Sequence, residues 1–252
     1  MIFSILSKVF PKFIVKILIR NKYKKYNREI HTQNIKDTNI VKINCSNQKK
    51  YLLLKQMLFK SFGGVLKIEK YIFYFHPIAI IQIPKNIDEY LKLIGAKSRN
   101  MNKKAEKNGI SCHVFDWNSK LEEIYKINTS TLIRQGREMD RAYREYPEKI
   151  IYPTADKGFS IVHIGAFVGD KLIGYVELYI YDNFVMTNRI LGHKEYLRYG
   201  VMNLMIKRCV EYGIESNLEY INYLTMQNRK NNSLSAFKYR VGFREYSLLE
   251  LI

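Results

Sequence analysis

The second half of the sequence predicts a mixed α/β domain, and three observations support this. Residues 160–168 and 171–181 alternate apolar and polar side chains and are joined by Gly169-Asp170, a pair typical of a hairpin turn. Residues 184–191 repeat the strand pattern after a second turn at Asp182-Asn183. The order then changes to a helix at 201–212, a strand at 220–226, a helix at 234–241 and a strand at 243–251. Three antiparallel strands followed by this alternation indicate one sheet covered by helices.

The first half of the chain carries shorter signals of the same kind. Expected elements are a helix at 50–62 that ends at Gly63-Gly64, two strands within 65–83, a helix at 84–94, a strand at 110–116 and a helix at 119–134. The segment between 95 and 109 is basic and is either a solvated helix face or the wall of a groove for a phosphate-bearing substrate. We therefore expect a basic amphipathic segment at 1–30, a partial N-terminal α/β region at 31–109 and the main domain at 110–252.

Residues 1–20 form an apolar stretch that basic side chains interrupt. Lys8, Lys12, Lys16 and Arg20 lie within it, and Pro11 lies in its middle. These interruptions argue against a membrane-spanning helix, and no small-residue cleavage site follows. Two readings stay open: a helix packed on the domain, or an interfacial helix that contacts an anionic membrane surface.

The formal net charge of +19 is the most unusual bulk property of this chain. Such a charge favours nucleic acid, an anionic membrane or a phosphorylated substrate as a partner, although a composition rich in Lys, Asn, Ile and Tyr also accounts for part of it. Three cysteines and five histidines are dispersed without paired metal-ligand spacing. We expect no metal site, free thiols in a reducing compartment, and a cytoplasmic protein whose first 20 residues can contact the inner face of the membrane.

The end of the chain carries the most specific pattern. Residues 231–244 read as an asparagine, a short helix and a Gly-Phe pair, and residues 193–203 read as a turn containing Gly200 before a helix. Together with the hairpin, these features resemble an acyltransferase of the GNAT superfamily over roughly 110–252. The resemblance implies a GNAT-like, mostly antiparallel sheet flanked by helices, and acetyl-CoA or another acyl-CoA as co-substrate.

In that superfamily the helix N-terminus after the turn receives the pyrophosphate of acyl-CoA, because it presents unpaired N–H groups and the positive end of a dipole. The resemblance assigns acyl-CoA binding to Arg198, Tyr199, Gly200, Val201, Met202, Asn203 and Asn231. Leu197 and Met202 depart from the outer positions of the usual signature, so the match at the turn is partial.

A second resemblance concerns the pair Phe237-Lys238. Most GNAT enzymes carry a tyrosine where this chain has Lys238, whereas the Fem-type peptidoglycan aminoacyltransferases, which are built from GNAT-like domains, carry a Phe-Lys pair followed by a glycine turn. Those proteins take an amino acid from aminoacyl-tRNA and contain two full GNAT-like domains, for which this chain is too short. The resemblance implies an alternative donor.

Three residues are candidates for catalysis. Lys238 can supply a positive charge where oxygen charge develops, or it is an exposed lysine of the last helix. Glu177 can serve as general base, or it belongs to the solvated face of its strand. Tyr239 is an alternative proton donor if the helix register differs by one residue.

Arginines after the helix at 119–134 are candidates for binding the acceptor. Arg134 and Arg137, with Arg141 and Arg144 beyond them, can bind a carboxylate or phosphate, or can pair with the acids between them. The small-molecule, glycan or peptide acceptor itself cannot be named from these residues.

Three functions follow. The first is acyl transfer from acyl-CoA to an amine or hydroxyl acceptor in cell-envelope or surface-glycan metabolism. The second is Fem-like aminoacyl transfer with aminoacyl-tRNA as partner. The third is a non-catalytic, basic membrane-binding or nucleic-acid-binding protein on a GNAT-like scaffold.

Overall fold

The computed structural model describes residues 78–134, 136–152, 158–226 and 233–251, and the short strands at 40–41, 65–68 and 71–74. The predicted helices at 1–20 and 50–62 lie outside the described residues, and so does Asn231.

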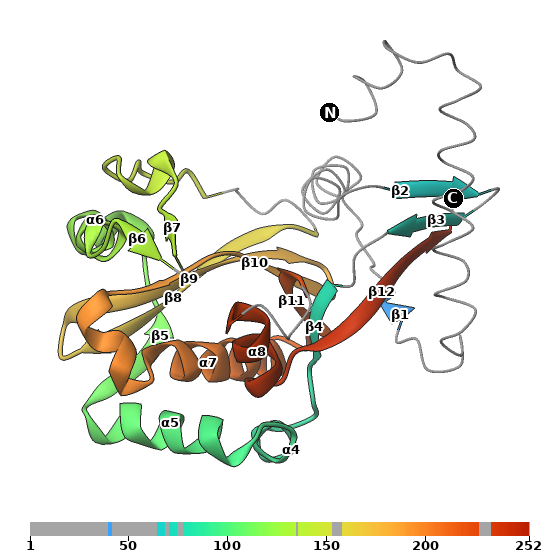
Figure 1. The fold of residues 1–252 in the computed structure, drawn as a ribbon, viewed down its shortest axis with the longest axis horizontal. Helices are drawn as coiled ribbons and strands as arrows, with labels where there is room; N and C mark the ends of the chain where they lie inside the picture. The colour runs from blue at the N-terminus through green and yellow to red at the C-terminus, as the bar shows by residue number, and fades with distance from the viewer. Residues whose placement is uncertain are drawn as a thin grey trace, which may run out of the picture. The chain divides into compact units, whose positions relative to one another are not determined.

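The described strands build one ten-stranded sheet and a separate two-stranded hairpin (Figure 1). Their order in the large sheet is β2-β3-β12-β4-β11-β10-β9-β8-β5, with β1 beside β12. The strands are β1 (Ile40–Val41), β2 (Val65–Ile68), β3 (Tyr71–Tyr74), β4 (Ile78–Gln82), β5 (Ile110–Val114), β8 (Ser160–Val168), β9 (Lys171–Tyr181), β10 (Phe184–Gly192), β11 (Tyr220–Thr225) and β12 (Arg244–Leu251). From β12 to β5 every neighbouring pair is antiparallel except β10 and β11, which are parallel. This confirms the predicted mixed, mostly antiparallel sheet.

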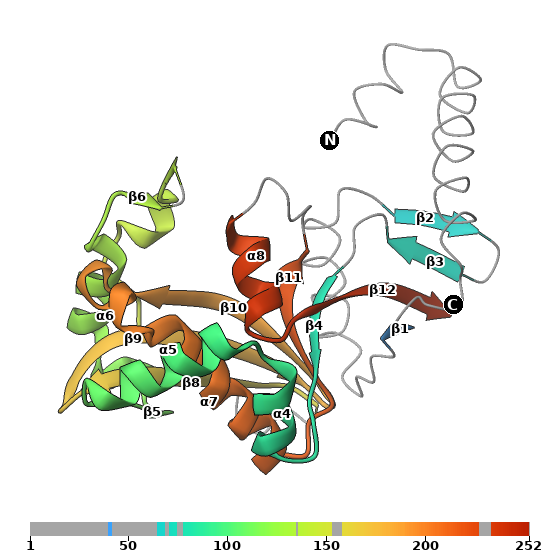
Figure 2. The same cartoon turned by 60° about the horizontal axis from the view of Figure 1, so that its bottom comes forward.

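Helices cover both faces of this sheet (Figures 1 and 2). One face carries α4 (Ile87–Leu93), α5 (Ala96–Lys107), α7 (Val201–Glu215) and α8 (Ser233–Arg240). The other carries α6 (Leu121–Thr129) and the hairpin of β6 (Ile133–Arg134) and β7 (Arg137–Glu138). We call these the α7 face and the α6 face.

The α7 face holds the larger core. Ile164 and Val176 of the sheet, Met205 and Val210 of α7, and Ala105 of α5 are all buried in it. β4 lies in the first half of the chain, yet it pairs with β11 on one side and with β12 on the other. Residues before and after position 110 therefore share one sheet and one core.

The α6 face holds a smaller core. Trp117, Ile124, Ile127 and Leu172 are buried there. The Tyr175 hydroxyl donates a 2.7 Å hydrogen bond to Asn128 Oδ1 of α6, and both residues are buried. This bond attaches α6 to the middle of β9, and Figure 1 shows the helix over one end of the sheet.

Three predictions about elements were wrong. The segment 65–83, where two strands were expected, contains the three strands β2, β3 and β4. The helix expected to stop at Gly213 continues to Glu215. Gly213 lies inside it and packs against Ile83, where an added Cβ would be 2.6 Å from Ile83 Cδ1. The helix expected at 119–134 ends at Thr129, and the chain turns into the β6–β7 hairpin instead. Helical apolar spacing alone does not show where tertiary contacts end a helix.

Candidate active site

Strands β10 and β11 separate part way along their length. They pair at Phe184–Tyr220, Val185–Ile221 and Met186–Asn222. Beyond these pairs β10 runs on to Gly192 and β11 to Thr225 without further pairing between them. Backbone groups of both strands are thus released from the ladder at one place.

A bulge on β11 shapes this place. The pairing of β11 with β4 shifts between Asn222 and Thr225, and Leu224 has φ of +51°. The side chain of the buried Asn222 stabilises the bulge: its Oδ1 accepts from Leu224 N at 3.1 Å, and its Nδ2 donates to Leu224 O at 3.1 Å. A β-branched or bulky residue rarely adopts a positive φ without such support. Asn222 therefore sets the direction of the neighbouring carbonyl groups.

Lys238 of α8 donates hydrogen bonds to carbonyl groups of this bulge. Its Nζ donates to Tyr223 O at 2.7 Å and to Thr225 O at 2.8 Å, and it lies 4.3 Å from the centre of the Tyr223 ring. The residue is buried, with 4% of its surface exposed, so the reading of Lys238 as an exposed lysine was wrong. Burial lowers the pKa of Lys238 to about 8.

The Gly-Phe pair after α8 fixes the end of the helix. Phe243 N donates to Lys238 O at 3.0 Å, and Gly242 has φ of +105°, a conformation that glycine adopts readily. A side chain at Gly242 would come within 3.2 Å of Tyr90 Cε2. Gly242 and Phe243 thus position Lys238 through the hydrogen bond from Phe243 N to the Lys238 carbonyl group.

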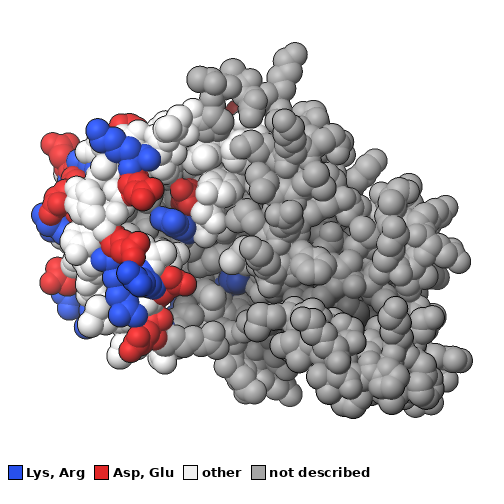
Figure 3. Space-filling model, turned by 90° about the horizontal axis from the view of Figure 1, so that it is seen from above, with Lys and Arg blue, Asp and Glu red and all other residues white. Residues whose placement is uncertain are grey.

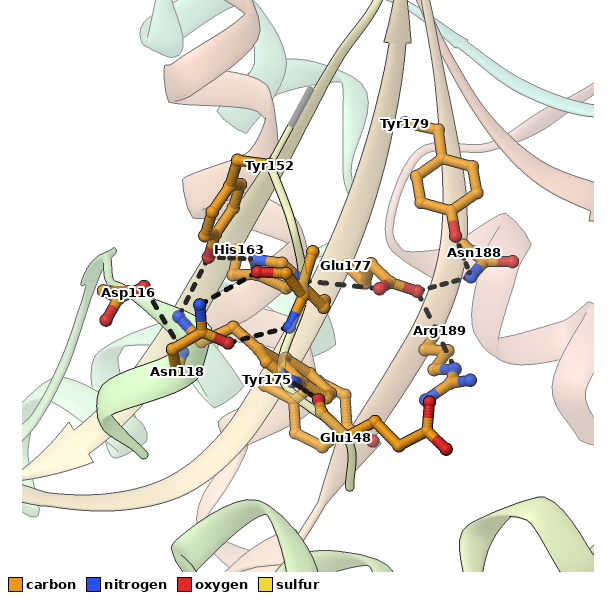
Figure 4. Close-up of polar contacts among 12 residues, drawn as sticks. Asp116, Asn118, Glu148, Tyr152, His163, Tyr175, Glu177, Tyr179, Asn188 and Arg189 are labelled. Atoms are coloured by element: carbon orange, nitrogen blue, oxygen red, sulfur yellow. Dashed lines mark hydrogen bonds and ion pairs between the residues drawn. The ribbon is translucent and has the colours of Figure 1, made fainter. Parts of the chain in front are cut away.

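A second polar group lies on the α6 face, on β9 beyond Tyr175. Glu177 is buried there, opposite His163 of β8 in the register. His163 Nε2 lies 3.4 Å from Glu177 Oε1, and Asn188 Nδ2 donates to Glu177 Oε2 (Figure 4). Arg189 Nε lies 3.7 Å from Glu177 Oε2. The reading of Glu177 as part of a solvated strand face was wrong.

The contacts of Glu177 keep its carboxylate ionised. Burial raises the pKa of Glu177, but hydrogen bonds from His163 and Asn188 and the charge of Arg189 lower the pKa by more. The pKa of Glu177 therefore lies below its ordinary value. At neutral pH the group is therefore a buried carboxylate that can accept a proton.

Tyr143 lies beside a partner of Glu177. Arg189, the partner of Glu177, lies 5.7 Å from the centre of the Tyr143 ring. On β11, burial raises the pKa of Tyr223, and the nearby Tyr143 hydroxyl raises it further. Tyr143 thus belongs to the surroundings of Glu177 on the α6 face, whereas Lys238 belongs to α8 on the α7 face.

The turn before α7 contains the predicted glycine at the N-terminus of the helix. Gly200 is the N-cap with φ of +88°, and no side chain caps the helix. An added Cβ on Gly200 would be 2.4 Å from Met101 O of α5, so glycine is required by this close approach. In the first turn of α7, Val201 is buried while Met202 and Asn203 are half-buried. The basic segment at 95–109 thus reaches this turn.

Arg198 and Tyr199 lie in the 3-10 helix that precedes Gly200. Arg198 is exposed, and its Nη2 donates to the Tyr199 hydroxyl at 2.7 Å. Lys104 of α5 donates to Arg198 O at 3.0 Å. The charge of Arg198 lies at the surface beside the helix N-terminus, where it can face an anion.

Arg134 is tied to the protein rather than free for an acceptor. Its guanidinium donates to Gly192 O at 3.1 Å and to Ile127 O at 3.2 Å, which joins the end of β10 to α6. The side chain of Arg137 lies outside the described residues. Arg141 pairs with Glu145 and Arg144 pairs with Glu138. Figure 3 shows basic and acidic side chains intermixed on the described part of the surface that it views.

Tyr239 points away from Lys238. It is exposed, and Arg244 Cζ lies 4.1 Å from its ring centre. The structure therefore gives Lys238, and not Tyr239, the place beside β11. Among the described residues no group of three His, Cys, Asp or Glu side chains is arranged to hold a metal ion. No described helix is both long and apolar enough to cross a membrane.

Several residues of the site escaped the sequence analysis. His163, Asn188 and Arg189 surround Glu177, while Asn222 and Tyr223 surround Lys238. Strand pairing places His163, Asn188 and Arg189 near Glu177, and α8 places Lys238 against β11. The alternation of 160–168 and 171–181 indicated that these strands pair, which was the available signal for His163.

Comparisons with known proteins concern the family and the fold. The family model described as the acetyltransferase (GNAT) family matches residues 119–243. Similar solved structures include FemX, with a TM-score of 0.55 and 15% identity over 79% of this chain and 66% of that chain. L-PGS from Bacillus licheniformis gives a TM-score of 0.47 and 13% identity over 81% of this chain and 65% of that one.

A GCN5-related N-acetyltransferase from Kribbella flavida gives a TM-score of 0.37 and 13% identity over 79% of this chain and 60% of that one. The chain thus spans less than two thirds of the length of these three structures. At these identities the likeness to FemX concerns the fold. No curated protein sequence matches this chain.

Proposed function

Because this chain belongs to the GNAT superfamily, through the domain at residues 119–243, we propose that it transfers an acetyl or other acyl group from acyl-CoA to an amine or hydroxyl acceptor. The proposal rests on the position of Lys238, which bonds two carbonyl groups of β11 near the point where β11 separates from β10. The resemblance to the Fem-type peptidoglycan aminoacyltransferases supports a glycan or peptide acceptor of the cell envelope.

In this proposal Lys238 stabilises the charge that develops on the acyl oxygen. An ammonium group has three donors, and the carbonyl oxygens of Tyr223 and Thr225 take two of them. The third remains for the oxygen of the acyl group. A donor that is held in place and shielded from water stabilises a developing oxyanion strongly, because it need not reorganise during the reaction.

Glu177 takes the proton of the acceptor in the same proposal. An amine or hydroxyl must lose a proton as it attacks the acyl carbon, and a positioned carboxylate can accept that proton directly or through water. Asn188 and Arg189 hold the carboxylate ionised, so it is ready at neutral pH. Tyr143 and Tyr179 lie around it and would contact the acceptor.

The turn at Gly200 is the proposed place for the pyrophosphate of acyl-CoA. α7 starts without a side-chain cap, so its first N–H groups can bind an anion. Arg198 is exposed nearby, and Lys194 begins the preceding 3-10 helix. Met101 O occupies the space beside Gly200, which leaves the outer side of the turn for the ligand.

Aminoacyl-tRNA is the second candidate donor. The buried Lys238 stands where most family members carry a tyrosine, and the fold is similar to that of FemX. The positive charge of the chain would favour a polyanion, whose affinity falls steeply with salt.

Calorimetric titration with acetyl-CoA and with charged tRNA, each at low and high salt, separates the two donors. The proposal expects saturable binding of acetyl-CoA and weaker tRNA binding. Binding of charged tRNA alone would favour the second candidate, and binding of neither at millimolar acetyl-CoA would reject both.

A further inference from the structure

Glu177 is connected through the protein to a pocket that lies apart from Lys238 and the Gly200 turn. The pocket has a volume of about 400 Å³ and is lined by Val114, Phe115, Asp116, Tyr152, Ile161, Val162 and His163. Its wall thus includes two members of a hydrogen-bonded chain that ends at Glu177 (Figure 4). The proposed reaction assigns no role to either of them.

The chain starts at Tyr152 and passes through His163. The Tyr152 hydroxyl lies 3.2 Å from His163 Nδ1, and His163 Nε2 lies 3.4 Å from Glu177 Oε1. Trp117 N donates to the Tyr152 hydroxyl at 3.0 Å, which fixes that oxygen in place. Both ring nitrogens of one buried histidine are therefore engaged, one toward the pocket and one toward Glu177.

Aromatic rings hold the imidazole in this orientation. Trp117 lies 4.8 Å from it, and Phe115 and Tyr152 lie 5.9 Å from it, measured between ring centres. The side chain of His163 is fully buried, so water does not compete for its nitrogens. A histidine that served only to fill space would not need a polar partner on each nitrogen, since a buried phenylalanine fills such a site without the cost of desolvation.

We propose that His163, held by Tyr152, is a positioning residue for Glu177: it donates from Nε2 and keeps the carboxylate ionised and directed between Asn188 and Arg189. This rests on the proposed function, in which Glu177 accepts the proton of the acceptor. His163 acts through Glu177 and has no contact with the reacting atoms.

The charged and titratable groups around the pair come from every neighbouring element. Glu177 faces His163 of β8, Arg189 of β10, Tyr143 of the 3-10 helix Arg141–Tyr143, and Tyr179 of its own strand. His163 faces Tyr152, and Asp116 lies behind the Tyr152 hydroxyl. Arg189 and His163 both favour the ionised form of Glu177. Removing His163 therefore weakens this stabilisation without removing all of it.

Two substitutions at His163 test the proposal. His163→Phe keeps the ring contacts but removes the donor, and His163→Gln restores an N–H donor near the position of Nε2. His113→Phe is the matched control, because His113 also stacks on an aromatic ring, Phe167 at 4.1 Å, but lies exposed on the neighbouring strand β5. Thermal melting of all three variants shows whether each is folded.

The first readout is the titration of the Glu177 carboxyl carbon by NMR, assigned by its absence in Glu177→Gln and recorded without any substrate. We expect the midpoint of Glu177 to rise by about one pH unit in His163→Phe, to return toward the wild-type value in His163→Gln, and to stay unchanged in His113→Phe. An unchanged midpoint in a folded His163→Phe protein would overturn the proposal.

The second readout is the pH profile of kcat/KM for acyl transfer. Transfer requires ionised Glu177, so its acidic limb should move to higher pH in His163→Phe by the same amount as the NMR midpoint, with KM nearly unchanged. A uniform loss of rate without such a shift would mean a structural role only and would also overturn the proposal. Absence of transfer by the wild-type protein would reject the proposed function instead, while the NMR midpoints would still decide the role of His163.

Discussion

Lys238 Nζ lies 2.7 Å from the carbonyl oxygen of Tyr223 and 4.3 Å from the centre of the same residue's ring. One residue of β11 thus provides both a hydrogen-bond acceptor and an aromatic surface for the only buried lysine of the described core. The arrangement depends on the bulge at Leu224, which turns the backbone of β11 toward α8. The bulge of β11 therefore helps to determine where the charge of Lys238 lies.

Replacing Lys238 tests its role in transfer. Lys238→Met keeps most of the apolar stem but removes the donors to the acyl oxygen, and we expect kcat to fall by roughly 10²–10³-fold. Steady-state kinetics check this, with Lys103→Met as control because Lys103 lies exposed on α5. A Lys238→Met protein that retains wild-type kcat would exclude Lys238 from the chemistry.

The lowered pKa of Lys238 predicts two effects of pH. Transfer should decline on the alkaline side with a midpoint near 8, because the uncharged amine stabilises an oxyanion poorly. Stability should change in the opposite direction. Between about pH 8 and the unfolded value, the unfolded chain binds the proton more tightly, so the free energy of unfolding rises with pH, by on the order of 3 kcal/mol in total from this group.

Urea unfolding at pH 7 and pH 10, compared between wild type and Lys238→Met, isolates this contribution. The wild-type protein should gain more stability over this interval than the variant does. An equal change in both proteins would mean that the pKa of Lys238 is close to its ordinary value.

Asn222 should be required for the shape of the site. Asn222→Ala leaves the backbone groups of Leu224 without their side-chain partner inside the protein, and an unpaired buried group costs about 1–3 kcal/mol. We expect a loss of about 2–3 kcal/mol in the free energy of unfolding and a lower kcat, since Lys238 loses its fixed acceptors. Chemical denaturation and kinetics measure both, and a stable, fully active variant would refute this account of the bulge.

Gly200 should resist substitution because of α5. Gly200→Ala places a Cβ 2.4 Å from Met101 O at a positive φ, and we expect a loss of about 2–4 kcal/mol in stability. Gly109→Ala is the matched control, since Gly109 has φ of +70° but open space around the position of a Cβ. If both variants lose the same stability, the close approach of α5 contributes nothing.

The sequence predicted the sheet well because alternation and turn residues are local signals. The hairpin of β8 and β9 was found from Gly169-Asp170, and both strands have the predicted bounds. The site was harder to predict because its residues meet through register. Counting from Val168↔Lys171 would place Val162 opposite Glu177, but an irregularity between Ala166 and Phe167 shifts the pairing by one residue. His163 takes that position instead.

Burial explains the remaining differences. The sequence left open whether Lys238 and Glu177 are exposed or belong to a site, because charged side chains are rarely buried unless they are paired. Their partners are the carbonyl groups of a bulge and the side chains of two neighbouring strands, which no local pattern contains. Likewise Arg134 was a candidate for binding the acceptor, and in the structure its guanidinium bonds backbone carbonyl groups of α6 and β10.

The central claim is that this chain takes its acyl group from acyl-CoA held at the Gly200 turn, and calorimetric titration with acetyl-CoA tests it most directly. Wild-type protein should bind acetyl-CoA saturably, and Arg198→Glu should weaken binding severalfold by placing a negative charge beside the pyrophosphate. Lys92→Glu should bind normally, because Lys92 lies exposed on α4 and outside the Gly200 turn. No binding by the wild-type protein at millimolar acetyl-CoA would contradict the claim.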